Sequence, residues 1–286
     1  MSEKGLKVLK GIIDFYGTEV IDLVVIGRDN AVLNDFSEDI EKCAKKRQIE
    51  TCYRNDSYVI STSYALAISW RWMIELNERV ILITLHDSLL PKYRGFAPLV
   101  SQLINGENSL GVSAIKSSEE FDRGDIISQA QIEISYPIKI QEAIDKVVEL
   151  YVQLTLSLME SIISNEDLLC HPQDDSKASY SLWRDEDDYK INWAMDAQAI
   201  IRFVNAVGYP YKGAKSTLSG INIRILDAYV LPDVEIENRT PGKVLFIKNG
   251  LPVVVCGKGL LQINQAIAED TQESVLPLSK LRVRFS

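Results

Sequence analysis

The sequence predicts an α/β protein, with a doubly wound, mostly parallel sheet first and a smaller β-rich lobe at the C-terminal end. The first observation is alternation, because buried strand-like runs such as 21–26 and 80–85 are separated by amphipathic helical segments. Such alternation is typical of a mostly parallel sheet that helices cover on both faces. The second observation is a succession of short β segments with turn residues between them near the C-terminal end. The length of 286 residues is sufficient for about two domains.

The N-terminal elements follow from the spacing of apolar residues. Leu6, Leu9 and Ile12 recur at helical spacing and predict a helix over 5–15. A second helix is expected over 37–46, with Ser37 as its N-cap. Further helices are expected over 97–104 and 140–163, and strands over 21–26, 63–69, 80–85, 109–115 and 125–134.

The first helix follows the start of the sequence almost at once. A doubly wound domain normally opens on a buried strand that leads into its first helix. The segment Met1–Lys4 (MSEK) is too short and polar to form such a strand. Either the first strand is missing, or the start codon used lies downstream of the true one.

The C-terminal third has a different organisation. A polar, irregular segment begins near Asn165, so we predict a catalytic domain over 1–165, a linker over 166–195 and a β-rich domain over 196–286. The β-rich domain is expected to open on a helix over 197–207. Its strands are expected over 221–226, 242–247, 253–256 and 260–263, with Lys248-Asn249-Gly250 as a hairpin turn.

Composition narrows the function class. The net charge of −9 argues against a nucleic-acid partner, because nucleic-acid binders usually present a basic face. No apolar run is long enough for a membrane span, and no secretory leader is visible at the N-terminus. The four cysteines lack metal-ligand spacing and are interpreted as reduced thiols of a cytoplasmic protein. No metal is expected.

Two polar clusters carry the predicted chemistry. The stretch 84–98 (TLHDSLLPKYRGFAP) follows a predicted buried strand, and ligands of open α/β sheets bind at the carboxyl ends of strands. The second cluster is FDRGDI, in which Asp122 and Asp125 flank a glycine turn. Taken alone, this second cluster is more typical of a solvated β-turn than of a functional site, because Asp and Gly are ordinary turn residues.

Together the clusters resemble the folate-dependent formyltransferases. That family carries Asn-x-His, then Ser-Leu-Leu-Pro and a basic Arg-Gly loop, and later an Asp-x-Gly turn. Here His86 matches the histidine, Ser88–Gly95 (SLLPKYRG) matches the loop, and Asp122 matches the aspartate. The resemblance continues through Tyr180–Trp193 and Pro241–Val244, so it covers most of the chain.

The resemblance implies transfer of a formyl group from 10-formyltetrahydrofolate to a primary amine. His86 would hydrogen-bond the developing oxyanion or handle the amine proton. Asp122 would raise the pKa of His86 or relay a proton through water. The sequence departs from the family at Thr84, where the family has Asn. Thr84 has one hydroxyl donor in place of a two-donor amide, so it is a working substitute, the mark of a slow or altered enzyme, or the cause of an inactive site.

The remaining predicted contacts divide between the two substrates. Trp70 and Trp72 are candidate walls of the pterin pocket, with core packing as the alternative, and Asp125 is assigned to the cofactor with them. Lys92, Tyr93 and Arg94 are assigned to a diphosphate, because arginine binds phosphate bidentately and lysine acts as a point charge. For Lys92, a solvated basic loop is the alternative.

The Ser-Trp-Arg-Trp run and the acidic charge favour the sugar N-formyltransferase branch, with a nucleotide-linked amino sugar as acceptor. Methionyl-tRNA formyltransferase is the nearest alternative, and it should show a basic face for tRNA phosphates. Two further alternatives are a catalytically impaired folate or nucleotide-sugar binding homologue and a hydrolase of the formyl donor. A homodimer paired through the smaller lobe is also suggested by the resemblance.

Overall fold

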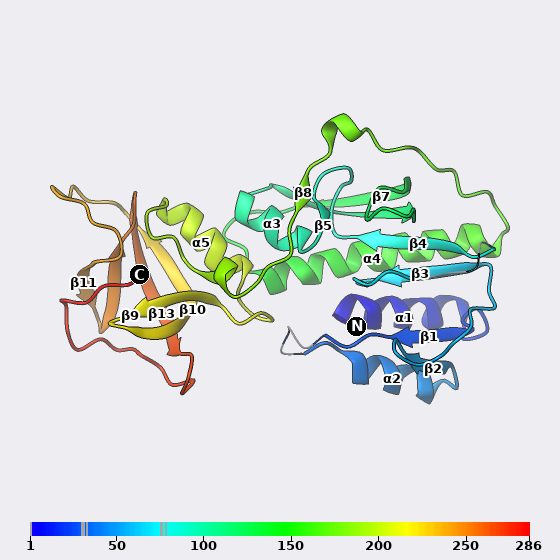
Figure 1. The fold of residues 1–286 in the computed structure, drawn as a ribbon, viewed down its shortest axis with the longest axis horizontal. Coiled ribbons are helices and arrows are strands. Elements are labelled where there is room, and N and C mark those ends of the chain that lie inside the picture. Colours follow the sequence, from blue (N-terminus) through cyan, green and yellow to red (C-terminus); the bar gives the residue numbers. More distant parts are fainter. Residues whose placement is uncertain (1, 30–31, 33, 75–76, 78) are drawn as a thin grey trace. The chain divides into compact units, whose positions relative to one another are not determined.

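The computed structural model describes residues 2–286 apart from 30–31, 33, 75–76 and 78. The chain divides into two compact units (Figure 1). The first unit comprises Met1–Leu99, Asn108–Ile134 and Ala143–Trp183, and the second comprises Val100–Glu107, Ser135–Glu142 and Arg184–Ser286.

The first unit is built from alternating strands and helices. In chain order its elements are α1 (Ser2–Tyr16), β1 (Leu23–Ile26), α2 (Ser37–Lys46), β2 (Glu50–Tyr53), β3 (Tyr64–Ile68), β4 (Ile81–His86), β5 (Arg94–Gly95), β6 (Ser109–Lys116), β7 (Asp125–Glu133), most of α4 (Ile140–Ile163), a 3-10 turn (Asp175–Lys177) and β8 (Tyr180–Ser181). The predicted helix over 140–163 is confirmed at both ends. Its apolar residues recur with a helical period over 24 residues, which makes it the least ambiguous pattern in the chain.

Two separate sheets form the frame of this unit. β1 pairs in parallel with β2, and a second sheet has the order β3-β4-β6-β7. β3 and β4 are parallel, whereas β6 is antiparallel to both β4 and β7. The predicted parallel pairing therefore holds for β1–β4 but not for β6 and β7. The connection of residues 117–124 is too short for the crossover that parallel neighbours would need.

The start of α2 differs from its prediction. Phe36 occupies the N-cap position with a φ of 58°, and Ser37 is the first helical residue. The carboxylate of Asp35 accepts hydrogen bonds from the backbone N–H (3.0 Å) and the hydroxyl (2.7 Å) of Ser37. The prediction of Ser37 as the cap was therefore wrong, because Asp35 provides the accepting oxygen.

The second unit is rich in β structure, as predicted. It contains most of α3 (Pro98–Asn105), a 3-10 turn (Asp187–Tyr189), α5 (Ala197–Ala206) and the strands β9 (Ala214–Leu218), β10 (Ile221–Leu231), β11 (Val244–Lys248), β12 (Leu251–Val255) and β13 (Leu260–Ala268). The strands form one antiparallel sheet in the order β11-β12-β13-β10-β9, and α5 lies beside β10 and β13 (Figure 1).

Local chemistry explains the start of α5 and the turn between β11 and β12. The side chain of Asp196 accepts a hydrogen bond from the N–H of Gln198 (2.8 Å) and so caps α5. Between β11 and β12, Asn249 and Gly250 both have positive φ, at 52° and 79°. Positive φ at both central residues is the requirement of a type I′ turn, so the predicted hairpin is confirmed.

In the described part of the chain, no helix combines the length and apolarity that crossing a bilayer requires.

Candidate active site

The candidate site begins at the carboxyl end of β4. Thr84 and His86 lie two residues apart on this strand, so their side chains project from the same face of the sheet. The β6–β7 connection returns along that face, since Thr84 contacts Ser117 and His86 contacts Asp122. The structure therefore brings together the three residues that the sequence assigns to catalysis.

His86 is held through both of its ring nitrogens. Nδ1 lies 3.3 Å from Oδ1 of Asp122, and Nε2 lies 2.8 Å from the carbonyl oxygen of Tyr93. Both neighbours are acceptors, so both hydrogen bonds form only when each ring nitrogen carries a proton. The geometry therefore favours the imidazolium form of a side chain that is only 6% exposed.

The charge balance of the pair points the same way. Burial disfavours the charged ring, but the hydrogen bond and the charge of Asp122 outweigh it and raise the pKa of His86. Burial likewise opposes ionisation of Asp122, but His86 and the N–H of Gly95, 2.8 Å from Oδ2, lower the pKa of the carboxyl. The two groups thus stabilise each other as an ion pair.

The hydroxyl of Thr84 lies 2.6 Å from the hydroxyl of Ser117. Either oxygen can donate, and Thr84 has only one proton to give. If Ser117 donates, the proton of Thr84 stays free for a developing oxyanion. If Thr84 donates to Ser117, it has no proton left for the oxyanion. The contribution of Thr84 therefore depends on Ser117, a residue that the motif does not include.

A buried network behind His86 was missed by the sequence analysis. Asp87 pairs with Lys4 of α1 and accepts a hydrogen bond from Tyr151 of α4, whose hydroxyl lies 3.0 Å from the carbonyl oxygen of Leu85. Burial opposes ionisation of Asp87, but Lys4 and Tyr151 outweigh it and lower the pKa of the carboxyl. The network ties the end of β4 to two helices. Tyr151 gave no sign of this role, because it occupies an apolar position of an amphipathic helix.

Arg94 is placed differently from its predicted role at a diphosphate. Its side chain is 1% exposed, with Nε 3.0 Å and Nη2 2.7 Å from Oε1 of Gln173 and Nη1 2.8 Å from Asp175. β5 and β8 pair in parallel, and a Cβ built on Gly95 would lie 2.5 Å from the carbonyl oxygen of Ser181. The strap, defined as residues 173–181, is thus clamped to the 92–96 loop. The geometry favours this structural role for Arg94.

The two other residues assigned to the acceptor lie on the same loop. Lys92 is exposed, and Tyr93 is half-buried with a φ of 61°. This left-handed conformation directs the Tyr93 carbonyl at Nε2 of His86. Lys92 is therefore the cation of this loop that is available to solvent, and its contact with substrate stays a prediction.

The tryptophan pair lies just after β3, beside β4. The rings of Trp70 and Trp72 meet edge to face with centroids 5.2 Å apart. The guanidinium groups of Arg54 and Arg71 lie 4.6 and 5.3 Å from the Trp72 centroid. In the described residues, the indole nitrogen of Trp70 is buried without a hydrogen-bond partner. Such an orphaned donor fits a site that donates a hydrogen bond to a ligand.

Asp125 lies apart from this cluster. It is exposed at the first position of β7, opposite Lys116 in the ladder, so its assignment to the cofactor stays a prediction. Within the described parts of the chain, no three His, Cys, Asp or Glu side chains gather as a metal site would require.

Comparisons with known proteins agree on one family. Residues 44–156 match the sequence profile described as formyl transferase, and residues 184–275 match the profile of the formyl transferase C-terminal domain. The chain is 32% identical over 163 residues to the methionyl-tRNA formyltransferase of Staphylococcus epidermidis, which covers 57% of this chain and 51% of that protein. The chain thus spans about half the length of that curated relative.

Solved structures support the fold. The N-formyltransferase of Helicobacter canadensis, solved with folinic acid and dTDP-3-aminofucose, has a TM-score of 0.69 at 14% identity, over 91% of this chain and 95% of that one. HypX of Aquifex aeolicus, in complex with tetrahydrofolic acid, has a TM-score of 0.65 at 18% identity, over 90% of this chain and 45% of that one. With profile matches over residues 44–156 and 184–275, the chain belongs to the formyl transferase family.

Proposed function

We propose that this protein transfers a formyl group from 10-formyltetrahydrofolate to the primary amine of a nucleotide-linked amino sugar. The observation that carries the proposal is the buried His86–Asp122 pair, because it holds an imidazolium at the carboxyl end of β4. Formyl transfer needs a donor at the oxygen of the formyl group, where negative charge develops as the amine attacks. A buried, positively charged ring supplies that donor in a medium of low dielectric constant.

The proposed reaction proceeds through one tetrahedral intermediate. The neutral amine nitrogen forms a bond to the formyl carbon, and the carbonyl electrons move to the oxygen. The bond from that carbon to N10 of the folate then breaks, N10 takes up a proton, and the amine nitrogen loses one. The products are the formamide and tetrahydrofolate, and no oxidant or reductant is needed.

The residues have distinct parts in this scheme. Nε2 of His86 donates to the oxyanion, for which it must leave the Tyr93 carbonyl that holds it at 2.8 Å. Asp122 keeps the ring charged and oriented from the opposite nitrogen. Thr84 adds a second donor whenever Ser117 supplies the proton of their shared hydrogen bond.

The donor site is proposed to lie between the ends of β3 and β4. The parallel register places Ile68 opposite Leu85, so Trp70 follows β3 at the level where Asp87 follows β4. The orphaned Trp70 indole nitrogen offers a hydrogen bond there, and the aromatic pair offers flat apolar surface for a pterin. Two proteins of the same fold were solved with a bound folate, which supports a folate as the donor.

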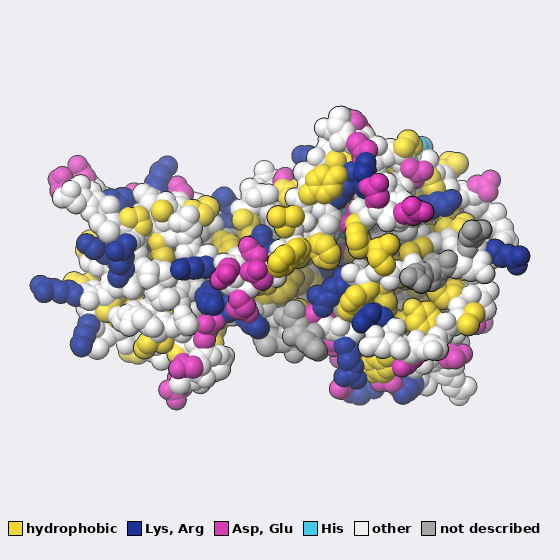
Figure 2. Space-filling view, in the orientation of Figure 1, with side chains coloured by type: hydrophobic (Ala, Val, Ile, Leu, Met, Phe, Trp, Pro, Cys, Tyr) yellow, Lys and Arg dark blue, Asp and Glu magenta, His cyan; other side chains and the backbone are white. Residues whose placement is uncertain are grey.

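The charge of the chain and its similarity to solved proteins both support a nucleotide-linked amino sugar as the acceptor. The net charge is −9, and on the face drawn in Figure 2 the Lys and Arg side chains are intermixed with Asp and Glu. A tRNA partner normally needs a broad basic surface. The Helicobacter canadensis structure contains a dTDP-linked amino sugar, and it matches nearly the whole of this chain.

Methionyl-tRNA formyl transfer is the second candidate function. Its support is the 32% identity to methionyl-tRNA formyltransferase, a higher identity than that to the sugar enzyme. Both functions use the same donor and the same attack by an amine, so the His86–Asp122 pair does not separate them.

The test is an assay with competing acceptors. The purified chain receives 10-formyltetrahydrofolate together with either a panel of dTDP- and UDP-linked amino sugars or methionyl-tRNA, and products are detected by mass. A gain of one formyl group on a sugar supports the first proposal, whereas formylmethionyl-tRNA alone supports the second. His86→Ala is the matched variant, and a wild-type rate in that variant would overturn the proposed roles.

A further inference from the structure

A buried ion pair lies directly behind His86. β4 ends at His86, and the next residue, Asp87, turns its side chain to the opposite side of the sheet, where it pairs with the ammonium group of Lys4. The side chains of Lys4 and Asp87 are 10% and 16% exposed. Replacing such a pair by apolar residues is often neutral for stability, so its presence here needs a functional explanation.

Tyr151 of α4 fixes the orientation of the Asp87 carboxylate. Its hydroxyl contacts Oδ1 of Asp87 and lies 3.0 Å from the carbonyl oxygen of Leu85. The Tyr151 ring also faces the Lys4 ammonium group, with 5.3 Å between Nζ and the ring centroid, and an aromatic face attracts a cation. Burial and the charge of Asp87 raise the pKa of Tyr151 well above its usual range, so the hydroxyl stays a neutral donor. The negative charge of Asp87 is thus held in one place beside the backbone of His86.

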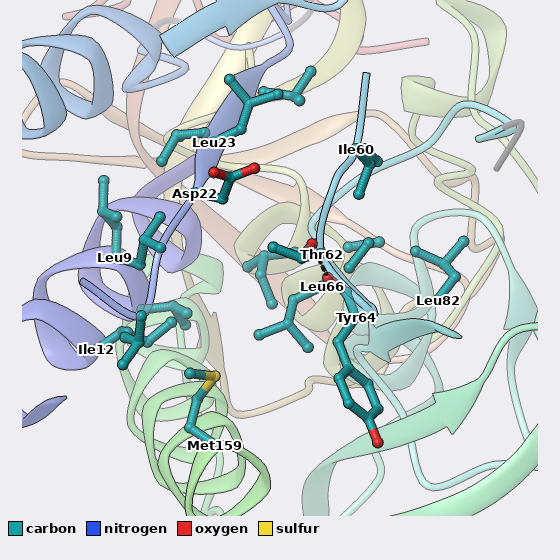
Figure 3. Close-up of a pocket in the computed structure, with 18 of the residues that line it drawn as sticks. Leu9, Ile12, Asp22, Leu23, Ile60, Thr62, Tyr64, Leu66, Leu82 and Met159 are labelled. Carbon is teal, nitrogen blue, oxygen red and sulfur yellow. Dashed lines mark hydrogen bonds between the residues drawn. The ribbon is translucent and has the colours of Figure 1, made fainter. Parts of the chain in front are cut away.

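The surroundings of α1 are apolar. Gly5, the residue after Lys4, is the first of the residues that line a cavity of about 590 Å³, and the described lining contains one charged residue, Asp22. Figure 3 shows Leu9 of α1 and Met159 of α4 bordering this space. The helix therefore brings its ammonium group to the end of β4 through a region of low polarity, where charges act on one another more strongly than in water.

Several elements contribute the charges that act on His86. Burial disfavours the protonated ring, whereas the carboxylate of Asp122 and, to a smaller extent, that of Asp87 raise the pKa of His86. Arg94 of β5 acts in turn on Asp122. Lys4 of α1 carries the charge opposite to that of Asp87 and lies against it, so it cancels part of the field that Asp87 exerts on the ring.

We propose that Asp87 is a positioning residue that acts through His86, and that Lys4 sets how much of the negative charge of Asp87 reaches the imidazole ring. Tyr151 keeps the carboxylate in place. The effect on catalysis rests on the proposed function, because the protonated ring is the donor to the oxyanion in that scheme. α1 thereby takes part in the chemistry of a site that the sequence motif confines to β4 and the loops.

The experiment follows the titration of His86 itself by NMR. The sequence has two histidines, and His171→Gln removes the exposed one, so a single imidazole signal remains. In this background the pKa of His86 is measured for the otherwise unchanged chain, Lys4→Met, Asp87→Asn and the double variant. Lys4→Arg is the matched control, because it keeps the positive charge.

The two single variants are expected to shift the titration in opposite directions. Lys4→Met subjects the ring to the full charge of Asp87 and raises the pKa of His86 by about half a pH unit or more, whereas Asp87→Asn lowers it by a similar amount. The double variant and Lys4→Arg stay close to the unchanged chain, since both preserve the balance of charge. If one single variant does not fold, the sign of the other decides. An unchanged titration or a shift of the wrong sign would overturn the inference.

The pH profile of kcat/KM separates this inference from the proposed function. The fall of activity at high pH is expected to move with the pKa of His86 from variant to variant. If the NMR titration moves and the profile does not, the network acts as inferred and the role of protonated His86 in formyl transfer is wrong. If activity drops while the NMR titration stays in place, Lys4 and Asp87 only support the fold and the inference fails.

Discussion

At the scale of single residues, the proposed mechanism makes the stabilisation of the oxyanion depend on Thr84. Thr84→Asn replaces one hydroxyl, already engaged by Ser117, with an amide that has two donors. Removing one oxyanion donor lowers kcat by about a hundredfold or more, so adding one is expected to raise kcat by about tenfold. Steady-state kinetics on the accepted amine would measure this. An unchanged or lower kcat would show that Thr84 is already a full substitute.

The His86–Asp122 pair predicts a shift in the pH dependence of activity. Asp122 raises the pKa of His86, and the proposed mechanism needs the protonated ring, so activity falls as pH rises through that pKa. Asp122→Asn removes the carboxylate and moves this fall to lower pH. The pH profile of kcat/KM would show it, with Glu119→Gln, at an exposed position of the same β6–β7 connection, as the matched control. Coincident profiles for wild type and Asp122→Asn would contradict the assigned role.

The same pair also predicts a pH dependence of stability without any assay of activity. A folded-state pKa above the ordinary value of 6.5 means that protonated His86 stabilises the native state fully below that pH. This stabilisation is lost as the pH rises through the raised pKa. Urea unfolding should therefore show the advantage of wild type over His86→Gln shrinking from pH 6 to higher pH. A constant difference would mean that His86 is not charged in the folded protein.

At the scale of elements, one ion pair fixes α1 to the end of β4. The side chains of Lys4 and Asp87 are 10% and 16% exposed, so removing one partner leaves a charge in a poorly solvated place. Lys4→Met is expected to lower the free energy of unfolding by about 3 kcal/mol. Lys7→Met, at an exposed position of the same helix, is the matched control and should change little. A loss below 1 kcal/mol in urea unfolding would show that Asp87 finds another partner.

Comparison of elements shows what the sequence could and could not predict. The helix 140–163 and the loop 84–95 could be predicted because the apolar period of the one and the motif of the other each lie within one continuous segment. β2 (Glu50–Tyr53) and β9 (Ala214–Leu218) were missed, because their short, mixed compositions lack a clear period. The burial of Arg94 was missed for a different reason. Its partners Gln173 and Asp175 follow almost eighty residues later, in a segment that has the composition of a linker.

At the scale of the whole molecule, the division into two units predicts the unfolding behaviour. The sheets of the first unit are separate from the five-stranded sheet of the second. The second unit is anchored by Arg224, which is 4% exposed and paired with Glu186 and Glu269. Calorimetry is expected to resolve two transitions. Arg224→Met should lower only one of them, and Lys4→Met only the other. A single transition shifted by both variants would mean that the units unfold together. The boundaries 1–165, 166–195 and 196–286 stay a prediction that limited proteolysis can test.

The strap has a consequence for how this chain tolerates changes in length. A spacer that only joins two units accepts extra residues almost anywhere. Here the freedom is confined to the stretch before His171, which exchanges two backbone hydrogen bonds with Ile126 of β7. From Gln173 onward the strap lies in fixed register against the 92–96 loop. Two glycines inserted after the exposed Asp167 are absorbed by a slacker loop. The same two glycines inserted after Gln173 displace Asp175 from Arg94 and loosen the turn that aims Tyr93 at His86. In this protein, an insertion far along the chain is therefore expected to disturb His86, almost ninety residues earlier.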